Sequence, residues 1–198
     1  HGKSFGALSL TFNPKYRKAF APLVEKVTFA SFGDMDSLRS AIDEDTALII
    51  LEPIQGESGI VVAPDGFLQE VRKLCDEKGI LLVFDEIQAG LGRTGRLWAG
   101  EHWNTVPDIL CLAKGIAGGV PMGATLVKPG ILAAISKGEH SSTFGGNPIS
   151  CAAGIAALTS LTEDGLIENS KKMGEIFREG LEKLKEKHTM IREIRGKG

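Results

Sequence analysis

The sequence has few cysteines, few aromatic side chains and no long apolar run. Its 198 residues include three cysteines and 6% aromatic residues. Because Cys75, Cys111 and Cys151 lie far apart, we expect reduced thiols and no disulfide framework. No apolar segment approaches the roughly 20 residues that a membrane helix needs, and the start of the chain lacks the layout of a secretory signal. We therefore expect a cytoplasmic globular protein that does not enter a membrane.

The chain also lacks an excess of either charge. It has 23 basic and 25 acidic residues, spread along its length, with a formal net charge of −2. This balance predicts neither a nucleic acid nor an anionic membrane as a partner. The four histidines show no spacing that would place two ligands on one helix face, so we expect no metal site. Small molecules remain as the favoured partners.

Short apolar runs rich in β-branched residues predict strands along most of the chain. They cover residues 24–30, 46–52, 80–85, 109–112 and 123–127. Helical patterns fill residues 35–42 and 66–78 between them. This alternation predicts an α/β fold with a mostly parallel sheet that is covered by helices on both faces.

The pattern changes after Pro148. Residues 149–161 are small and apolar, which is typical of a buried helix, and residues 169–187 are amphipathic. The last residues, 191–198, look like the first strand of a smaller domain. We expect residues 1–161 to form part of a large domain, and residues 162–198 a connecting helix and the start of a small C-terminal domain. The chain is then expected to be a piece of a longer one.

Three glycines after the strand at 80–85 spell a dinucleotide-binding motif. Gly90, Gly92 and Gly95 match G-x-G-x-x-G, the fingerprint of nicotinamide enzymes. That fingerprint needs its first glycine directly after the strand and an acidic residue at the end of the next strand. Gly90 comes five residues after Asp85, and the next strand runs into Lys114. Turn chemistry is the better reading, and an NAD-dependent oxidoreductase is a minor alternative.

Asp85 and Lys114 follow neighbouring predicted strands. Ligands of open α/β sheets bind at the carboxyl ends of the strands. A single lysine at such a place is usually a surface residue, but here a carboxylate ends the neighbouring strand and glycines surround the lysine, at 115, 118, 119 and 123. An amine that can bind an aldehyde and a carboxylate that can hold a protonated pyridine nitrogen are what pyridoxal phosphate requires. The pair favours that cofactor.

An ordered series of short motifs resembles one family. The motifs are H-G at 1–2, E-P-I-Q-G-E at 52–57, F-D-E-I-Q at 84–88, G-R-T-G at 92–95, A-K-G at 113–115, G-V-P-M-G at 119–123, T-F-G-G-N-P at 143–148 and R-G-K-G at 195–198. They resemble the class III (subgroup II) pyridoxal-phosphate aminotransferases of fold type I, above all the acetylornithine and ornithine branch. The resemblance covers essentially the whole chain.

The resemblance implies a role for each of the central residues. Lys114 would bind the cofactor as a Schiff base and then carry a proton between the substrate and the cofactor. Asp85 would pair with the pyridinium nitrogen. Gln88 would hydrogen-bond the phenolic oxygen of the ring, and Ile87 would pack against one ring face.

Further residues take roles only through the resemblance. Thr143 would reach across a dimer interface to the phosphate of the other subunit's cofactor, which implies a homodimer with shared active sites; from the residues alone, a helix cap or a turn is equally open. Glu57 would pair with an arginine and swing to admit different substrate carboxylates. His1 and Gly2 would belong to the cofactor-binding residues, with the rest of the phosphate cradle upstream.

The function that the resemblance implies is amino-group transfer. The enzyme would move the terminal amino group of an acylated ornithine- or lysine-type substrate to 2-oxoglutarate, in arginine or lysine biosynthesis. Ornithine and 4-aminobutyrate aminotransferases share every motif, so both stay open. A semialdehyde aminomutase and a catalytically silent fragment are further alternatives.

Overall fold

The computed structural model describes all 198 residues, which form two compact units, His1–Thr46 and Ala47–Gly198. The first unit contains only helices: α1 (Phe5–Ser9), α2 (Pro14–Arg17), η1 (Lys18–Phe20) and α3 (Met35–Ser40). Asp34 begins α3, because its carboxylate accepts the N–H groups of Asp36 and Ser37, both at 3.0 Å. The helix predicted at 35–42 is thus confirmed.

The strand predicted at 24–30 is wrong, because this segment of the first unit is irregular. Lys26 has a φ of 57°, a left-handed conformation that interrupts an extended backbone. The N–H of Val24 donates to the side-chain Oγ of Ser9 at 3.0 Å instead of to a neighbouring strand. The Phe29 ring packs edge-on against Phe12, with centroids 5.5 Å apart. The apolar side chains of residues 24–30 therefore pack locally and do not form a strand.

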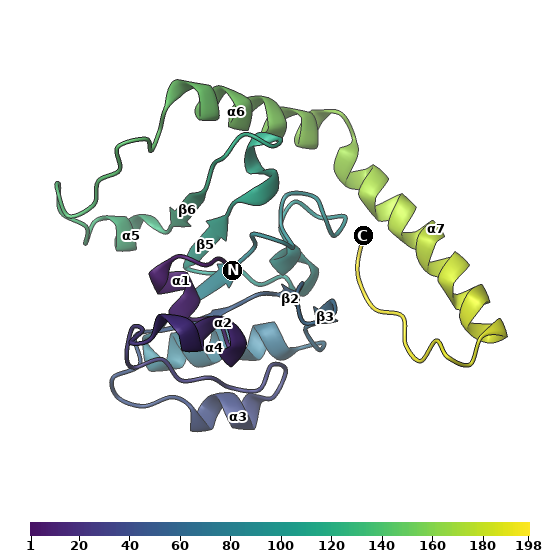
Figure 1. Ribbon diagram of the computed structural model, residues 1–198, viewed down its shortest axis with the longest axis horizontal. Helices are drawn as coiled ribbons and strands as arrows, with labels where there is room; N and C mark the ends of the chain where they lie inside the picture. Colours follow the sequence, from purple (N-terminus) through teal and green to yellow (C-terminus); the bar gives the residue numbers. More distant parts are fainter. The chain divides into compact units, whose positions relative to one another are not determined.

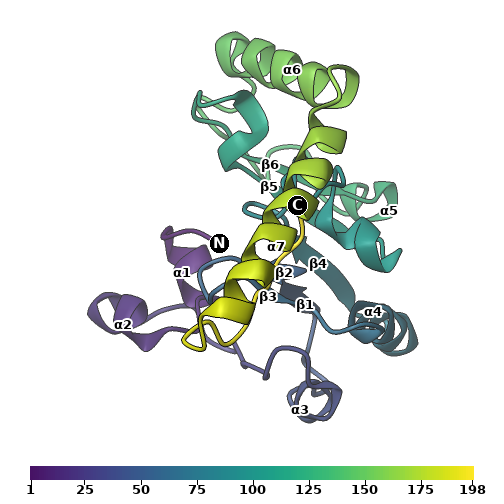
Figure 2. The same ribbon diagram turned by 90° about the vertical axis from the view of Figure 1, so that its right-hand side faces the viewer.

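The second unit is built on a four-stranded sheet with the order β1-β4-β5-β6 (Figures 1 and 2). Its strands are β1 (Leu48–Leu51), β4 (Leu81–Asp85), β5 (Ile109–Leu112) and β6 (Ala124–Val127). β1, β4 and β5 are parallel, and β6 runs antiparallel to β5. The four strands predicted for this region are confirmed, and so is the mostly parallel α/β fold.

A small hairpin follows β1 that the sequence did not predict. It consists of β2 (Ile54–Gln55) and β3 (Val61–Val62), which pair antiparallel. The N–H groups of Gly59 and Ile60 both donate to the carbonyl oxygen of Gly56, at 3.3 Å each. Gly59 has a φ of +96°, so the loop needs a residue without a side chain there. The hairpin carries Glu57 at its tip.

The helix α4 (Phe67–Lys78) packs against β4 and forms the main core of the second unit. It ends at Gly79, whose φ of +68° fits a left-handed cap and whose N–H bonds to the Cys75 carbonyl oxygen. The prediction at 66–78 is confirmed. Completely buried side chains on α4 and β4 fill this core: Leu68, Val71, Cys75, Leu82 and Phe84. Their burial fixes the strand that ends in Asp85.

The helix α6 (Pro148–Glu163) crosses the end of the sheet at which β5 finishes (Figure 1). The helix predicted at 149–161 is confirmed, but the expectation that it is buried is wrong for this chain. Ile149 and Ile155 are 75% and 67% exposed, whereas Ser150 and Gly154 on the opposite side are buried. The helix is apolar all round but packs in this chain through a single face.

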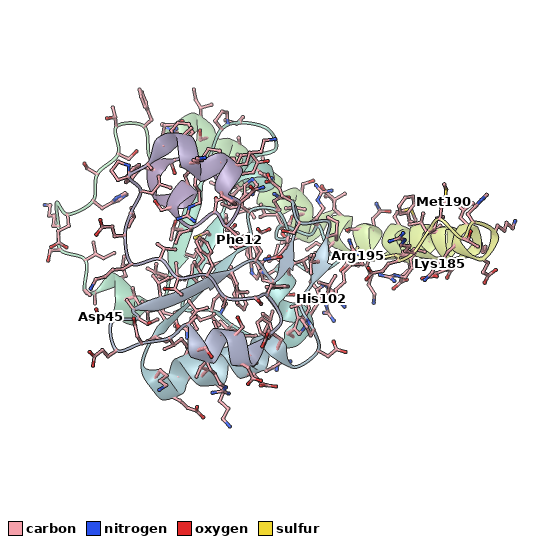
Figure 3. The ribbon with its side chains drawn as sticks, turned by 60° about the horizontal axis from the view of Figure 1, so that its bottom comes forward. Phe12, Asp45, His102, Lys185, Met190 and Arg195 are labelled. Carbon is pink, nitrogen blue, oxygen red and sulfur yellow. The ribbon has the colours of Figure 1, made fainter.

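The helix α7 (Leu166–Lys187) leaves α6 at an angle, and the two views agree on this (Figures 1 and 2). Figure 3 shows Lys185 and Met190 on the part that projects away from the sheet. The amphipathic helix predicted at 169–187 is confirmed. The strand predicted at 191–198 is not formed, because no strand of the chain pairs with this segment. The domain boundary at 161 lies inside α6 and stays a prediction. No helix is long and apolar enough to cross a membrane.

Candidate active site

Asp85 is the last residue of β4 and lies in the register position opposite Cys111 of β5. Asp85 is only 4% exposed to solvent. One carboxylate oxygen, Oδ1, accepts the N–H of Ile87 at 3.1 Å. A buried carboxylate is expensive to desolvate unless it has partners. Its position at the carboxyl end of a parallel strand is where α/β sheets bind their ligands.

Lys114 stands two residues beyond the end of β5, at the same edge of the sheet as Asp85. It begins the short helix η3 (Lys114–Ala117) and is exposed. Its φ is 47°, the left-handed region, while the preceding Ala113 is extended with a φ of −163°. For a residue with a Cβ this conformation costs on the order of 1 kcal/mol, and such strain clusters at functional sites. Lys114 is one of five non-glycine residues with a positive φ, and among them it is the one that the sequence selected at a strand end.

A packed layer behind η3 supports the strained backbone. Ile116 and Ala117 are buried in a small apolar cluster with Leu112. Gly154 of α6 approaches so closely that an added Cβ would lie 3.0 Å from the sulfur of Met122. Ser150, also on α6, donates a hydrogen bond to the Pro121 carbonyl oxygen at 3.2 Å. The Lys114 side chain is therefore exposed on a firmly held turn.

Gln88 brings two of the motifs together. It lies in the turn after β4, and its side chain packs against Gly56 of the E-P-I-Q-G-E motif: a Cβ on Gly56 would lie 2.7 Å from Cδ of Gln88 and closer still to Oε1. The N–H of Gly56 donates to Glu52 at 3.0 Å. Ile87 is half-buried in the same turn, and Glu57 is exposed on the adjoining loop. The structure thus brings the turn at 85–88 and the loop that carries Glu57 together.

Thr143 lies in the loop before α6 and is exposed. The cap of α6 is Asn147, whose Oδ1 accepts the N–H of Ser150 at 2.9 Å. Thr143 is therefore not the helix cap that the sequence left open, and its part in a dimer stays a prediction. His1 and Gly2 belong to the first unit, and their contribution to the cofactor site also stays a prediction.

Glu86 was overlooked in the sequence, although it is the most buried acid next to the site. It is 0% exposed, and its two carboxylate oxygens accept the N–H groups of Ala99 and Gly100 at 2.9 and 2.8 Å. Burial raises the pKa of Glu86, and these two N–H donors oppose that effect. The sequence feature that could have pointed to Glu86 is the presence of a second acid directly after Asp85, at the end of a fully apolar strand.

The glycines of the G-x-G-x-x-G segment are explained by packing. A Cβ on Gly92 would lie 3.2 Å from Leu161 and from Ile167, and one on Gly95 would lie 2.7 Å from the Cβ of Lys171. Ser170 donates to the Arg93 carbonyl oxygen at 3.0 Å. The segment is the surface on which α6 and α7 rest, and no helix begins at its first glycine to bind a pyrophosphate.

One cavity of the second unit is separate from the candidate site. Its volume is about 260 Å³, and its wall contains none of Asp85, Gln88 and Lys114. The wall is formed largely by apolar side chains at the amino-terminal part of β5 and around η2 (Ala99–Trp103), among them Phe84, Trp98, Val106, Leu110 and Leu126.

Cys75, Cys111 and Cys151 are free thiols. Burial raises the pKa of Cys75 to about 11 and raises that of Cys111 as well, so both stay protonated near neutral pH. No group of three or more histidine, cysteine, aspartate or glutamate side chains is arranged to hold a metal ion.

Comparison with known proteins gives the family. Residues 1–198 match the family described as Aminotransferase class-III, and the chain belongs to it. It is 46% identical over 198 residues to the acetylornithine aminotransferase of Methanopyrus kandleri and 49% identical to that of Caldanaerobacter subterraneus subsp. tengcongensis. Each match covers 100% of this chain and 50% of the relative. The chain therefore spans about half the length of these curated relatives.

A solved structure shares the fold over the whole chain. It is the ornithine aminotransferase of Toxoplasma gondii, crystallised with oxidised glutathione and described as having partial occupancy of PLP at its active site. The TM-score is 0.95 at 38% identity, over 100% of this chain and 47% of that one. Fold and family together indicate pyridoxal phosphate as the cofactor.

Proposed function

We propose that the full-length protein is a pyridoxal-phosphate-dependent aminotransferase with Lys114 and Asp85 as its catalytic residues. The observation that carries this proposal is the geometry of the pair. Asp85 ends β4 opposite Cys111, and Lys114 follows the end of β5 at the same edge of the sheet, in a left-handed conformation that is uncommon for a residue with a Cβ.

The residues present fit this cofactor. A buried carboxylate at one strand end and an exposed amine at the next are the two groups that a pyridine aldehyde needs from a protein. When bound, pyridoxal phosphate supplies an electron sink that stabilises negative charge on the substrate carbon.

The turn after β4 would hold the ring. Asp85 stabilises a proton on the ring nitrogen, because its carboxylate is negative and shielded from water. Gln88 would donate a hydrogen bond to the ring hydroxyl oxygen, and the Ile87 side chain would cover one face of the ring. Because Asp85, Ile87 and Gln88 lie on one short turn, their side chains would reach the ring nitrogen, one ring face and the ring oxygen.

Lys114 has two roles in sequence. Its amine would hold the cofactor covalently until an amino substrate takes its place. Once free, this amine would act as the general base that takes a proton from the substrate carbon and as the acid that gives it back. One side chain is both nucleophile and general base, so its loss removes both functions.

The proposed substrates are a terminal amino group of an N-acylated ornithine- or lysine-type amino acid and 2-oxoglutarate, in arginine or lysine biosynthesis. The acetylornithine aminotransferases among the relatives support this choice. Glu57, exposed on the β2–β3 loop, would swing so that the site admits the different carboxylate groups of the two substrates. Unacylated ornithine is a second candidate, since the ornithine aminotransferase of Toxoplasma gondii has the same fold over this whole chain.

The proposal includes a cytoplasmic homodimer in which Thr143 of each subunit serves the other subunit's cofactor phosphate. Apolar side chains that lie exposed around Thr143 support an interface there: Phe144 is 81% exposed and Ile149 is 75% exposed. Exposed apolar residues gathered in one segment are typical of protein contact surfaces.

The test is chemical labelling of the full-length protein. Protein mixed with pyridoxal phosphate is reduced with borohydride, digested and analysed by peptide mass spectrometry. We expect one modified residue, Lys114. Labelling scattered over surface lysines such as Lys73 and Lys78 would contradict the proposal.

A further inference from the structure

The Glu86 carboxylate joins two parts of the second unit that are far apart in sequence. It is completely buried, and each of its oxygens accepts one backbone N–H from the start of η2, those of Ala99 and Gly100. Hydrogen bonds from two N–H groups to a buried carboxylate are among the stronger ones in proteins. The side chain of Glu86 is therefore an anchor between the end of β4 and η2.

The backbone of Glu86 makes two more connections. Its N–H donates to the Cys111 carbonyl oxygen of β5 at 3.0 Å, and its own carbonyl oxygen accepts the N–H of Gly90 at 2.9 Å. A Cβ on Gly90 would lie 2.8 Å from that carbonyl oxygen, so the contact requires glycine. These bonds close the turn that contains Ile87 and Gln88 and attach it to the strand that leads to Lys114.

The other end of the anchor is rigid. Trp103 of η2 is 4% exposed, and its indole N–H donates to the Pro64 carbonyl oxygen at 3.2 Å. Gly100 packs against the ring of Phe84, where a Cβ would lie 2.7 Å from a ring carbon. The turn after β4 is thus fastened to a part of the core that is fixed independently.

We propose that Glu86 is a positioning residue of the cofactor site: by anchoring the turn at 85–90 to η2, it keeps Asp85 and Gln88 in place at the edge of the sheet that carries Lys114. This inference rests on the proposed function. Glu86 itself touches neither substrate nor cofactor in this account, and it acts through its neighbours on the turn.

Asp108 offers a matched control on the same two strands. It precedes β5, and its carboxylate accepts the Leu82 N–H at 2.8 Å as well as bonds from Arg72 and Lys128 at 2.6 and 2.7 Å. Like Glu86 it is a well-bonded acid that links β4 to another element. It lies at the amino ends of the strands, away from Asp85.

The experiment compares three forms of the full-length protein: the unmodified protein, the Glu86→Gln variant and the Asp108→Asn variant. Glutamine keeps the size of Glu86 but presents an NH₂ group to one of the two N–H donors. We expect Glu86→Gln to weaken pyridoxal phosphate binding to the apoenzyme roughly tenfold or more. Asp108→Asn is expected to lower the thermal midpoint of the apoenzyme while changing cofactor affinity less than about twofold. If Glu86→Gln weakens cofactor binding no more than Asp108→Asn does, the positioning role is wrong.

Amide hydrogen exchange of the unmodified protein tests the same idea if Glu86→Gln does not fold. By thermodynamic linkage, if the hydrogen bonds of Glu86 strengthen cofactor binding, cofactor binding must strengthen those hydrogen bonds by the same free energy. Pyridoxal phosphate should then slow exchange at Ala99 and Gly100 more than at Leu82, whose N–H bonds to Asp108. Equal slowing at all three amides would overturn the inference.

The two failures are distinguishable. If borohydride labelling of the unmodified protein misses Lys114, the proposed function fails and Glu86 has no cofactor site to position. If Lys114 is labelled but Glu86→Gln binds pyridoxal phosphate as tightly as the unmodified protein, only the role of Glu86 is overturned.

Discussion

The side chain of Gln88 occupies the space that a side chain on Gly56 would need. An alanine Cβ at position 56 would lie 2.7 Å from Cδ of Gln88, far inside van der Waals contact. Gly56 has no positive φ, so the backbone would accept alanine. The glycine of the E-P-I-Q-G-E motif therefore leaves room for the Gln88 side chain of the F-D-E-I-Q motif, and its own backbone conformation does not call for glycine.

We expect Gly56→Ala to act on the cofactor through Gln88. The added methyl group must push the amide of Gln88 away, which removes one hydrogen bond to the ring, so the Kd for pyridoxal phosphate should rise about five- to tenfold. Spectroscopic titration of full-length apoenzyme measures this. Gly180→Ala on the exposed side of α7 is the matched control, since nothing lies within 4 Å of a Cβ there.

A double-mutant cycle decides whether Gln88 transmits the effect. In a Gln88→Ala background, Gly56→Ala should change cofactor affinity by less than about twofold, because the group that it displaces is already gone. Additive losses in the double variant would show that Gly56 acts by another route.

Replacing Lys114 separates its chemistry from its backbone strain. Lys114→Ala and Lys114→Gly should both lower turnover by at least about a thousandfold, since both remove the amine. Glycine adopts the left-handed φ without a Cβ clash, so Lys114→Gly should be more stable than Lys114→Ala by on the order of 1 kcal/mol.

Steady-state kinetics and denaturant unfolding of the full-length variants measure the two effects. Lys73→Ala on the exposed face of α4 controls for loss of any lysine. Residual turnover near the unmodified level in both Lys114 variants would remove Lys114 from the mechanism.

The sheet and its two key residues could be predicted because both depend on local pattern. Apolar runs gave the strands of the second unit, and parallel strands place their carboxyl ends together, which brought Asp85 and Lys114 to one edge. The contacts that hold the site join distant parts of the chain. Gly56 with Gln88, and Glu86 with Ala99, leave no periodic trace in the sequence.

The failed predictions have a common physical cause. Residues 24–30 have strand composition, but Lys26 turns the backbone left-handed. Residues 149–161 are apolar enough for a core, but only one face of α6 meets the rest of this chain. Composition reports what a segment can bury, whereas the presence of a partner decides whether it forms a strand or a buried helix.

Thr143 is expected to influence cofactor binding more than chemistry. Thr143→Ala removes a hydroxyl that would bond the phosphate, so the Kd for pyridoxal phosphate should rise about tenfold while kcat at saturating cofactor changes less. Thr143→Ser keeps the hydroxyl and should restore most of the affinity. Unchanged cofactor retention in Thr143→Ala would count against a phosphate site shared between subunits.

Arg195 holds the loop that carries Glu57. Its Nε and Nη2 atoms both donate to the Gly59 carbonyl oxygen, at 3.1 and 2.8 Å, and its guanidinium also pairs with Glu193. Arg195→Ala should therefore speed amide exchange in the loop at 56–60 by about fivefold, as expected for the loss of about one net hydrogen bond.

The control for Arg195 is Arg192→Ala, which removes an exposed arginine three residues earlier in the same segment. Exchange in the loop should not respond to that change. If both variants leave the loop at its original rate, the Arg195 contact does not stabilise it in solution.

Asp108 should make the protein sensitive to acid. Burial opposes the charged form, but the Leu82 N–H, Lys128 and Arg72 together hold its pKa at about 2, below the model-compound value of 3.8. A group whose pKa is lower in the folded state stabilises the fold above the unfolded pKa and loses that contribution as pH falls. The free energy of unfolding should thus drop by about 2 kcal/mol from this group between pH 5 and pH 2.

The measurement is denaturant unfolding of the full-length apoenzyme across that pH range, with and without Asp108→Asn. Asparagine does not titrate, so the variant should be less stable at pH 7 and should lose less of its remaining stability on acidification. The two curves should approach each other toward pH 2, because protonated aspartate resembles asparagine in charge. Parallel curves over the whole range would mean that the pKa of Asp108 is the same in the folded and unfolded protein. Its bonds to Arg72 and Lys128 would then stabilise the charged carboxylate no better than water does.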